Sequence, residues 1–359
     1  MHHVALGRSG IKASRLGFGA IKLPEVSREQ ASAALNLALD LGINFIDTAR
    51  NYRDSERKIG FAIGGRRSEF TLATKSSGRS SGDAWKDLET SRRELDMDYI
   101  DLWQLHSVSG MSEWKQVMGR GGALEAAKKA LAQGIIGHIG ITIHRDLGVM
   151  REAILSGEFE TIMLCHNVLD PEGVGADVLP LAKEHDVGTI IMKPLIGGSL
   201  SRPGHAQDHD PVARGSLRAL LGEDTVDIVI PGMRSEREVR ENVATEAMPA
   251  LSPEEYRELL NSLGRLQASH RYGQRCLRCG YCLDQCPEGI PIPDVFRAMD
   301  MQRAYPEHLK HLAWELYRSL SMQADACQAC GSCVAVCPAG LDIPAMMEEV
   351  AAAFASARA

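Results

Sequence analysis

Short apolar runs alternate with amphipathic segments from residue 15 to about residue 232. The segments 27–42 and 121–134 carry apolar residues at helical spacing and end in glycine, which is typical of helices with a glycine stop. The strand-type runs are 14–21, 43–49, 70–75, 98–106, 137–142, 161–167, 188–194 and 227–232. Eight strand–helix units over this length predict a (β/α)8 TIM barrel, an α/β fold. A doubly wound open sheet is the alternative, but the G-x-G-x-x-G turn expected after its first strand is absent.

Additional elements flank the barrel pattern. Residues 2–14 have the pattern of a hairpin ahead of the first barrel strand. A last amphipathic helix, 252–267, begins with Ser252 as N-cap and Pro253 at the first helical position. Both elements are expected to belong to the same domain as the barrel.

The pattern changes after about residue 269. Strand-type runs stop, and only cysteine clusters and helical patches such as 306–320 follow. The sequence therefore predicts two domains, a barrel at 1–268 and a small, mostly helical domain at 269–359.

Eight of the nine cysteines lie in the last quarter of the chain. They form two copies of the pattern C-x2-C-x2-C-x3-C-P, at 276–287 and 327–338. Bacterial ferredoxins hold iron–sulfur clusters with this spacing, in which three thiolates surround one face of a cubane cluster. A zinc site is the alternative, but it calls for separated C-x-x-C pairs. The ninth cysteine, Cys165, lies in an apolar run and is expected to pack as a small hydrophobic side chain.

The cysteine region resembles the two-cluster ferredoxins. The 40 residues between Cys286 and Cys327 have helical pattern, which resembles the α-helical ferredoxins found in iron–sulfur subunits of multi-part reductases. The resemblance implies two 4Fe–4S clusters with crossed ligation, because the last cysteine of each motif binds the cluster of the other motif. One implied ligand set is Cys276, Cys279, Cys282 and Cys337. The other is Cys327, Cys330, Cys333 and Cys286.

Four titratable residues lie at or just beyond the carboxyl ends of predicted strands. Asp47 ends the second strand and Tyr52 follows it, whereas Lys75 and His106 end the third and fourth. Chemistry in TIM barrels takes place at this end, so these side chains are expected to converge. A tyrosine becomes a useful acid or base when a lysine ammonium lies beside it, and a carboxylate keeps that lysine charged. Taken singly, each residue also fits a structural role.

Residues 1–268 resemble the aldo–keto reductase family. The motifs that carry the resemblance are GINFIDTARNYRDSERKIG, LATK, DLWQLH, GHIGIT, MKPLIGGSL and IPGMRSEREVRENV, in the order of the family. The resemblance implies that Tyr52 is the general acid–base, that Lys75 and Asp47 tune it, and that His106 orients a substrate carbonyl. A nicotinamide cofactor would then deliver hydride to a small carbonyl substrate, or accept it from an alcohol, at the mouth of the barrel.

The same resemblance implies a set of cofactor-binding residues. They are Thr142, Asn167, Pro194, Leu195, Gly197, Leu200, Gly232, Arg234, Glu238, Glu241 and Asn242. Arg234 favours NADP(H) because its guanidinium could bind a 2′-phosphate. Glu238 would repel that phosphate, so NAD(H) remains the alternative cofactor. Ile143 and His144 depart from the family's usual serine–asparagine pair, which leaves Thr142 as the one retained hydroxyl.

The composition of the chain indicates which classes of binding partner to expect. The apolar fraction of 44% and the charged fraction of 24% are ordinary for a globular protein, and a net charge of −7 argues against nucleic acid. No apolar run is long enough to span a membrane, and the first residues lack a secretory signal. We therefore expect a cytoplasmic protein whose cysteines are not disulfide-bonded.

Joining a barrel of this kind to iron–sulfur clusters leaves three interpretations. In the first, the barrel performs carbonyl chemistry and the clusters are structural or link it to a partner. In the second, the clusters deliver single electrons from an external one-electron carrier protein to the substrate or to an unseen cofactor. In the third, the barrel is a non-catalytic module that senses nucleotide or redox state. A hydride carries two electrons and a cluster one, so direct exchange between them needs a flavin or similar cofactor.

Overall fold

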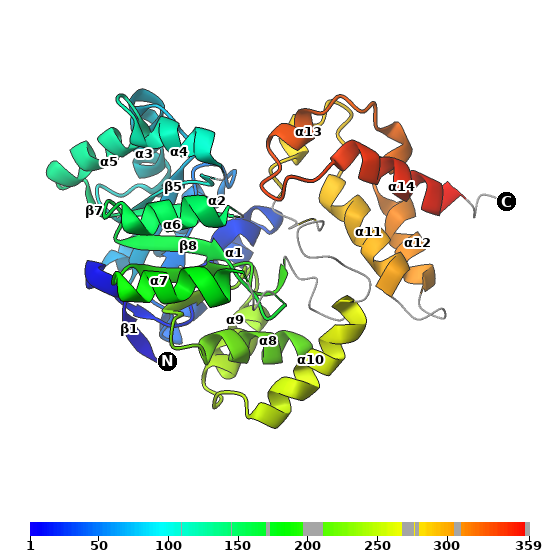
Figure 1. Ribbon diagram of the computed structural model, residues 1–359, viewed down its shortest axis with the longest axis horizontal. Coiled ribbons are helices and arrows are strands. Elements are labelled where there is room, and N and C mark those ends of the chain that lie inside the picture. Colours follow the sequence, from blue (N-terminus) through cyan, green and yellow to red (C-terminus); the bar gives the residue numbers. More distant parts are fainter. Residues whose placement is uncertain are drawn as a thin grey trace. The chain divides into compact units, whose positions relative to one another are not determined.

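The computed structural model describes residues 1–108, 110–144, 146–169, 173–196, 211–267, 276, 280–304 and 310–355. The chain divides into two compact units, Met1–Leu259 and Leu260–Ala359, and each is described here by itself. The first unit holds all the strands of the described chain, and the second is helical (Figure 1). None of the described helices is long and apolar enough to cross a membrane.

Eight parallel strands form the centre of the first unit, paired in the order in which they follow one another along the chain. They are β3 (Phe18–Gly19), β4 (Phe45–Asp47), β5 (Thr71–Ser76), β6 (Ile100–Leu105), β7 (Ile136–Ile143), β8 (Thr161–Cys165), β9 (Gly188–Met192) and β10 (Ile228–Ile230). Bridges between the segments of β10 and β3 close the sheet, and Gly17 N donates to Val229 O at 2.9 Å. A Cβ at Gly19 would lie 2.9 Å from Pro231 O, so glycine is needed for this close approach. The predicted TIM barrel is confirmed.

The first barrel strand is shorter than its apolar run predicts. Only Phe18 and Gly19 are strand, although the run covers 14–21. Ser14 belongs instead to the hairpin of β1 (His3–Ala5) and β2 (Lys12–Ser14), which is antiparallel as expected. The chain between hairpin and strand meets the β10 segment only through isolated bridges, because it turns from one sheet into the other.

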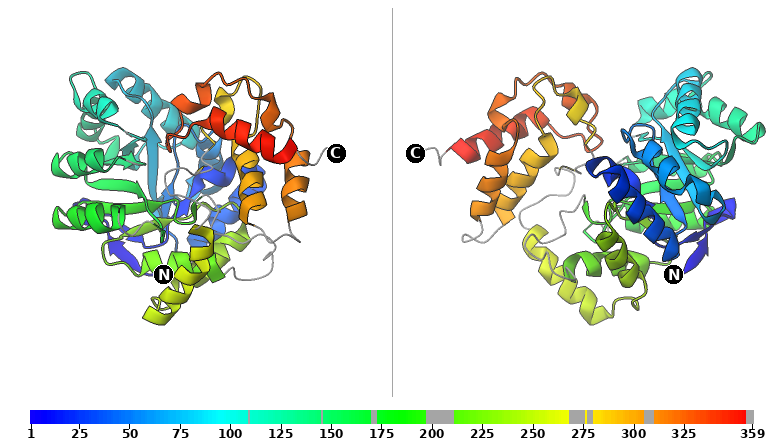
Figure 2. Two further views of the ribbon diagram at one scale, coloured as in Figure 1. Left: turned by 45° about the vertical axis from the view of Figure 1, so that its right-hand side comes forward. Right: turned by 180° about the vertical axis from the view of Figure 1, so that it is seen from behind.

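Helices cover the outside of the barrel (Figures 1 and 2). They are α1 (Arg28–Asp40), α2 (Ser55–Ile63), α3 (Ser81–Leu95), α4 (Met111–Met118), α5 (Ala123–Ala132), α6 (Leu147–Leu155), α7 (Leu179–Glu184), α8 (Pro211–Leu221) and α9 (Glu236–Glu246). A further helix, α10 (Pro253–Gln267), follows them and crosses the boundary between the two units. α1 shows why these segments are helical. Ser27 and Gln30 form a capping box at its start, and its apolar face, which includes Leu35, is buried. At the start of α10, Ser252 Oγ accepts from Glu255 N at 3.1 Å, which agrees with the predicted N-cap.

The strand register brings polar side chains to the carboxyl end of the barrel. Lys75 on β5 is opposite Gln104 on β6, and Asp47 on β4 is opposite Ala73 on β5. Apolar side chains of the same strands, such as Ile46 and Trp103, are fully buried as well. Burial of the polar groups among them keeps water away and makes their mutual interactions strong.

The second unit has its own core. Its helices are α11 (Ile292–Ala304), α12 (Lys310–Ser319), α13 (Ser332–Ala335) and α14 (Ile343–Ala355). α12 and α14 pack through a stacked pair of rings, Tyr317 and Phe354, whose centroids are 4.1 Å apart. Figure 2 shows α11 and α12 side by side with α14 across them. The expectation of a small, mostly helical domain is confirmed for the described residues of this unit.

Candidate functional site

A buried ion pair occupies the carboxyl end of β4 and β5. Lys75 Nζ donates to Asp47 Oδ2 at 2.6 Å and to the Thr48 carbonyl at 2.6 Å, and both charged side chains are almost completely shielded from solvent. Gln104 Nε2 donates to the second carboxylate oxygen of Asp47 at 3.3 Å. Burial raises the pKa of Asp47 and lowers the pKa of Lys75, and the attraction between the two charges opposes both shifts.

Tyr52 lies against this ion pair. It is half-buried in the turn between β4 and α2, and its ring centroid is 5.0 Å from Lys75 Nζ. The His106 ring meets the Tyr52 ring edge-on, with centroids 5.9 Å apart and an interplanar angle of 77°. The structure therefore brings together all four residues that were singled out at the strand ends.

The surroundings of His106 favour its neutral form. Burial, and then the positive charges of Lys75, Arg79 and Lys193, hold the pKa of His106 well below its ordinary value of 6.5. Ser77 Oγ lies 3.4 Å from His106 Nδ1. A neutral imidazole at this place can donate one N–H to a ligand without bringing in another positive charge.

Arg79 fixes the backbone beside His106. Its guanidinium donates to the carbonyls of His106 at 2.8 Å and Ser107 at 3.0 Å, and it pairs with Glu113 at 3.2 Å. Ser107 has a positive φ of 54°, a conformation that a serine rarely adopts without such support. The prediction from sequence missed Arg79 because it lies on a loop past the end of β5.

Glu56 is a further acidic residue whose charge acts on Lys75, and the prediction from sequence did not include it. It lies in the first turn of α2 with only 1% exposure, accepts a hydrogen bond from Thr74 Oγ1 at 2.7 Å, and pairs with Arg50. Burial raises the pKa of Glu56, and its charge raises the pKa of Lys75. A glutamate in the first turn of a helix usually faces solvent, so nothing in the sequence indicates this burial.

The implied cofactor-binding residues on β7 and just after β8 are placed as follows. Thr142 is fully buried, and its Oγ1 accepts from Ser107 N at 2.7 Å. Asn167 follows β8 and its Oδ1 accepts from Leu169 N at 3.0 Å. His144, in place of the family's asparagine, is buried with its ring centroid 6.5 Å from that of His106 and its Nδ1 3.2 Å from Ser107 Oγ.

The remaining cofactor-binding residues that the resemblance implies are only partly described. Pro194 and Leu195 follow β9, whereas Gly197 and Leu200 lie outside the described residues. Arg234 pairs with Glu25, and its backbone N–H donates to Glu238 Oε2 at 2.8 Å. Glu241 Oε1 lies 3.8 Å from Arg237 Nε, and Asn242 is on the same helix, α9. Gly232 lies beside Lys22, whose Cγ would be 3.3 Å from an added Cβ.

One lysine at the carboxyl end of the barrel has no hydrogen-bond partner for its ammonium among the described residues. This is Lys193 Nζ, which is shielded from solvent. Its residue follows β9 directly. The positive charge of this ammonium can attract an oxyanion, such as a phosphate or carboxylate group of a ligand.

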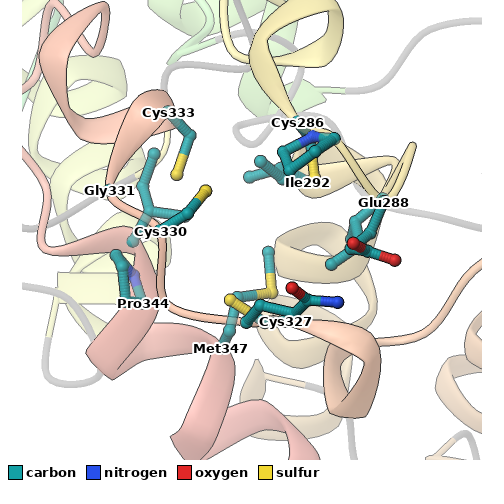
Figure 3. A pocket seen from close by; sticks show the side chains of 13 residues that line it. Cys286, Glu288, Ile292, Cys327, Cys330, Gly331, Cys333, Pro344 and Met347 are labelled. Carbon is teal, nitrogen blue, oxygen red and sulfur yellow. The ribbon is translucent and has the colours of Figure 1, made fainter.

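Two cysteine-lined pockets lie in the second unit. The first is lined by Cys327, Cys330, Cys333 and, from the other motif, Cys286. Figure 3 shows the sulfur atoms of Cys330 and Cys333 close together, with Cys286 on the facing wall. Apart from these sulfurs the lining is mainly apolar, as with Met347. Burial and the neighbouring cysteines raise the pKa of Cys333. Thiolates crowded in this way repel one another, and a cationic group between them would stabilise them.

The second pocket repeats this arrangement with the motifs exchanged. It is lined by Cys276, Cys282 and Cys337, whereas Cys279 lies outside the described residues. Ile292 and Ile343 line both pockets. The described cysteines thus line the two pockets in the crossed combination that the ferredoxin resemblance implies, and soft sulfur side chains of this kind suit iron–sulfur ligation.

Fold and side chains together define a TIM-barrel protein of the aldo–keto reductase class with a separate iron–sulfur domain. Residues 15–220 match the aldo/keto reductase family, and the chain belongs to that family. Residues 272–341 match the 4Fe-4S dicluster domain.

Similar proteins extend this result. The uncharacterized oxidoreductase YqkF of Bacillus subtilis is 27% identical over 71% of this chain and 94% of its own length. L-galactose dehydrogenase of Arabidopsis thaliana is 28% identical over 67% and 86%. Among solved structures, the holo form of an aldo-keto reductase from Bacillus halodurans has a TM-score of 0.62 at 28% identity and covers 73% of this chain and 96% of its own. An aldo/keto reductase from Klebsiella pneumoniae in complex with NADP and acetate has a TM-score of 0.60 at 26% identity, covering 72% and 94%.

Proposed function

We propose that the protein is an NAD(P)H-dependent oxidoreductase that interconverts a small carbonyl compound and its alcohol in the barrel, and that it holds two 4Fe–4S clusters for electron exchange with a partner. One observation carries the proposal for the barrel. The ammonium of Lys75, which is paired with Asp47, lies over the Tyr52 ring, and a neutral His106 meets that ring edge-on. This arrangement suits proton transfer to or from a substrate oxygen.

Tyr52 is the proton donor in the direction of reduction. Its hydroxyl gives a proton to the carbonyl oxygen, and in the reverse direction the same oxygen takes the proton from the alcohol. The ammonium of Lys75 beside the ring stabilises the phenolate that is left behind. Asp47 holds Lys75 in place and charged, because an isolated ammonium at this depth would lose its proton.

His106 orients the substrate. As a neutral imidazole it donates an N–H to the carbonyl oxygen and holds that oxygen within reach of Tyr52. When bound, NAD(P)H supplies the hydride for the carbonyl carbon, and a 4Fe–4S cluster supplies or takes up one electron at a time.

NADPH is the cofactor that we favour over NADH. Two solved relatives from Klebsiella pneumoniae are complexes with NADP and with NADPH. Arg234 follows β10 at the position that the family resemblance assigns to the adenosine end. Its present partners, Glu25 and Glu238, would have to release it to a 2′-phosphate.

For the second unit, the crossed grouping of cysteines in two pockets supports two clusters, and the exposed Cys330 gives one of them a solvent-facing side. We propose that an external one-electron carrier protein docks on this unit. The barrel's four-residue arrangement favours catalysis over a purely sensing role.

The test of the barrel proposal compares the wild type with Tyr52→Phe under anaerobic conditions. NADPH oxidation is followed with a panel of aldehydes and ketones, and NADPH binding is measured separately. We expect the variant to lose about 10²- to 10⁴-fold in kcat and to bind NADPH nearly as well, because only the proton donor is removed. Turnover that survives in Tyr52→Phe would rule out this role for the tyrosine.

A further inference from the structure

Lys193 occupies a fixed position at the end of β9 (Gly188–Met192). Its φ is 57°, in the left-handed region that non-glycine residues rarely adopt, and Ile196 N donates to its carbonyl at 2.9 Å. A turn therefore holds the lysine backbone in a strained conformation. Strain of this kind at the carboxyl end of a barrel strand is characteristic of functional positions.

The lysine belongs to the wall of the barrel opposite the ion pair. β9 is four strands away from β5 in the order of the sheet, in either direction around the closed barrel. Lys193 directly follows the carboxyl end of β9, and Lys75 lies near the carboxyl end of β5, so both belong to the same end of the barrel. The charge of Lys193 also lowers the pKa values of Lys75 and His106. A ligand that reaches Tyr52 and His106 would therefore pass close to Lys193.

Lys193 differs from the other cationic residues of the site in its lack of an acidic partner among the described residues. Lys75 is paired with Asp47, and Arg79 with Glu113. Lys193 Nζ, by contrast, is shielded from solvent and has no hydrogen-bond partner in the described part of the chain. A buried ammonium without a partner is unfavourable, and a bound anion would remove that penalty.

We propose that Lys193 binds an oxyanion, a carboxylate or phosphate group, of the ligand that reacts at this site. The proposal rests on the carbonyl–alcohol chemistry proposed above and adds the charge class of its ligand. The oxyanion has two sources, a carboxylate on the substrate or the diphosphate of the nicotinamide cofactor. In either case the ammonium is a binding residue that selects and positions the ligand.

The test measures anion binding by the full-length holoprotein without any turnover. The probes are sodium acetate and sodium pyrophosphate, each titrated at constant ionic strength while the rise in Tm is recorded to obtain an apparent Kd. The variants are Lys193→Met, which keeps the length of the side chain and removes the charge, and Lys193→Arg, which keeps the charge. Lys86→Met, at an exposed lysine of α3, is the matched control.

We expect Lys193→Met to weaken one of the two probes by about 10- to 100-fold, and Lys193→Arg and Lys86→Met to bind it nearly normally. Weakened acetate binding assigns the lysine to a substrate carboxylate, and weakened pyrophosphate binding assigns it to the cofactor. Without ligand, the Tm of Lys193→Met should equal or exceed that of the wild type, because an unpaired buried charge is gone.

The proposal is overturned if neither probe binds the wild type, or if both bind Lys193→Met as tightly. A lower Tm for Lys193→Met with unchanged binding would likewise overturn it, since that result identifies a structural lysine. Because no step of the test requires hydride transfer, failure of the carbonyl reductase proposal in the Tyr52→Phe assay leaves these outcomes readable.

Discussion

Lys75 and Asp47 form a salt bridge of 2.6 Å from which water is almost completely excluded. Removing one member leaves the other charge buried alone. We therefore expect Asp47→Asn to lower the free energy of unfolding by about 3–5 kcal/mol, and Lys75→Met to act in the same direction. Urea titration followed by circular dichroism measures the effect.

The double variant Asp47→Asn/Lys75→Met separates stability from chemistry. It contains neither unpaired charge, so it should recover much of the stability that Asp47→Asn loses, while carbonyl reduction stays impaired. Recovery of both properties would show that the pair serves folding and that Tyr52 needs no ammonium.

The depressed pKa of His106 has a consequence for stability at acid pH. Its folded-state pKa lies well below the ordinary value of 6.5, so the unfolded chain binds a proton at this residue before the folded chain does. The histidine's contribution is present above about pH 6.5 and is lost progressively as the pH falls toward the folded-state pKa. We expect His106→Gln to reduce the difference in unfolding free energy between pH 7.5 and pH 5.5.

His185→Gln provides the matched control for that measurement, because His185 is exposed. Its pH dependence should follow the wild type. If His106→Gln also follows the wild type, the imidazole is not held neutral by its surroundings.

The cysteine pockets predict a defined metal content. With two complete ligand sets, we expect eight iron and eight acid-labile sulfides per chain, and a brown colour that dithionite bleaches. Elemental analysis after anaerobic purification provides the numbers. Stoichiometric zinc without sulfide would contradict the ferredoxin interpretation.

Cys286→Ser tests the crossed grouping. Cys286 lines the pocket of Cys327, Cys330 and Cys333, so its loss should damage the cluster there and lower the iron content toward about four per chain. The signal of the cluster held with Cys337 should survive in electron paramagnetic resonance. Cys165→Ser, at a buried cysteine of the barrel, should keep the full iron content.

The relation between hydride and electron transfer gives a further prediction. No flavin signature is evident in the sequence, so NADPH alone should leave the cluster absorbance unchanged, whereas dithionite should bleach it fully. Anaerobic stopped-flow spectroscopy follows both reactions. Rapid bleaching by NADPH without added flavin would mean that an additional redox cofactor connects the two reactions.

Sequence patterns predicted the parts of the site that depend on periodicity and spacing. Asp47 ends β4, Lys75 is the next-to-last residue of β5 and His106 directly follows β6. The geometry of a barrel brings such strand ends together. The crossed grouping of cysteines followed from ligand spacing and from the resemblance to ferredoxins. In each case a local pattern determines a spatial result.

The burial and pairing of the other charged residues depend on tertiary packing, which no local sequence pattern indicates. Glu56 is buried because α2 packs it against Thr74, and Lys193 is unpaired because no carboxylate in the described chain comes within reach. Arg234 pairs with Glu25, a residue far from it in the sequence. The length of β3 was overestimated because its apolar run also serves the junction between hairpin and barrel.

The two cysteine pockets share the side chains of Ile292 and Ile343 in their walls. With a cluster in each, one layer of apolar side chains separates two groups whose charge changes on reduction. The negative charge of the first electron is poorly screened across such a layer, so it makes entry of the second electron harder. The pair should therefore titrate as two successive one-electron waves, and the domain should pass electrons singly even when both centres have the same ligands.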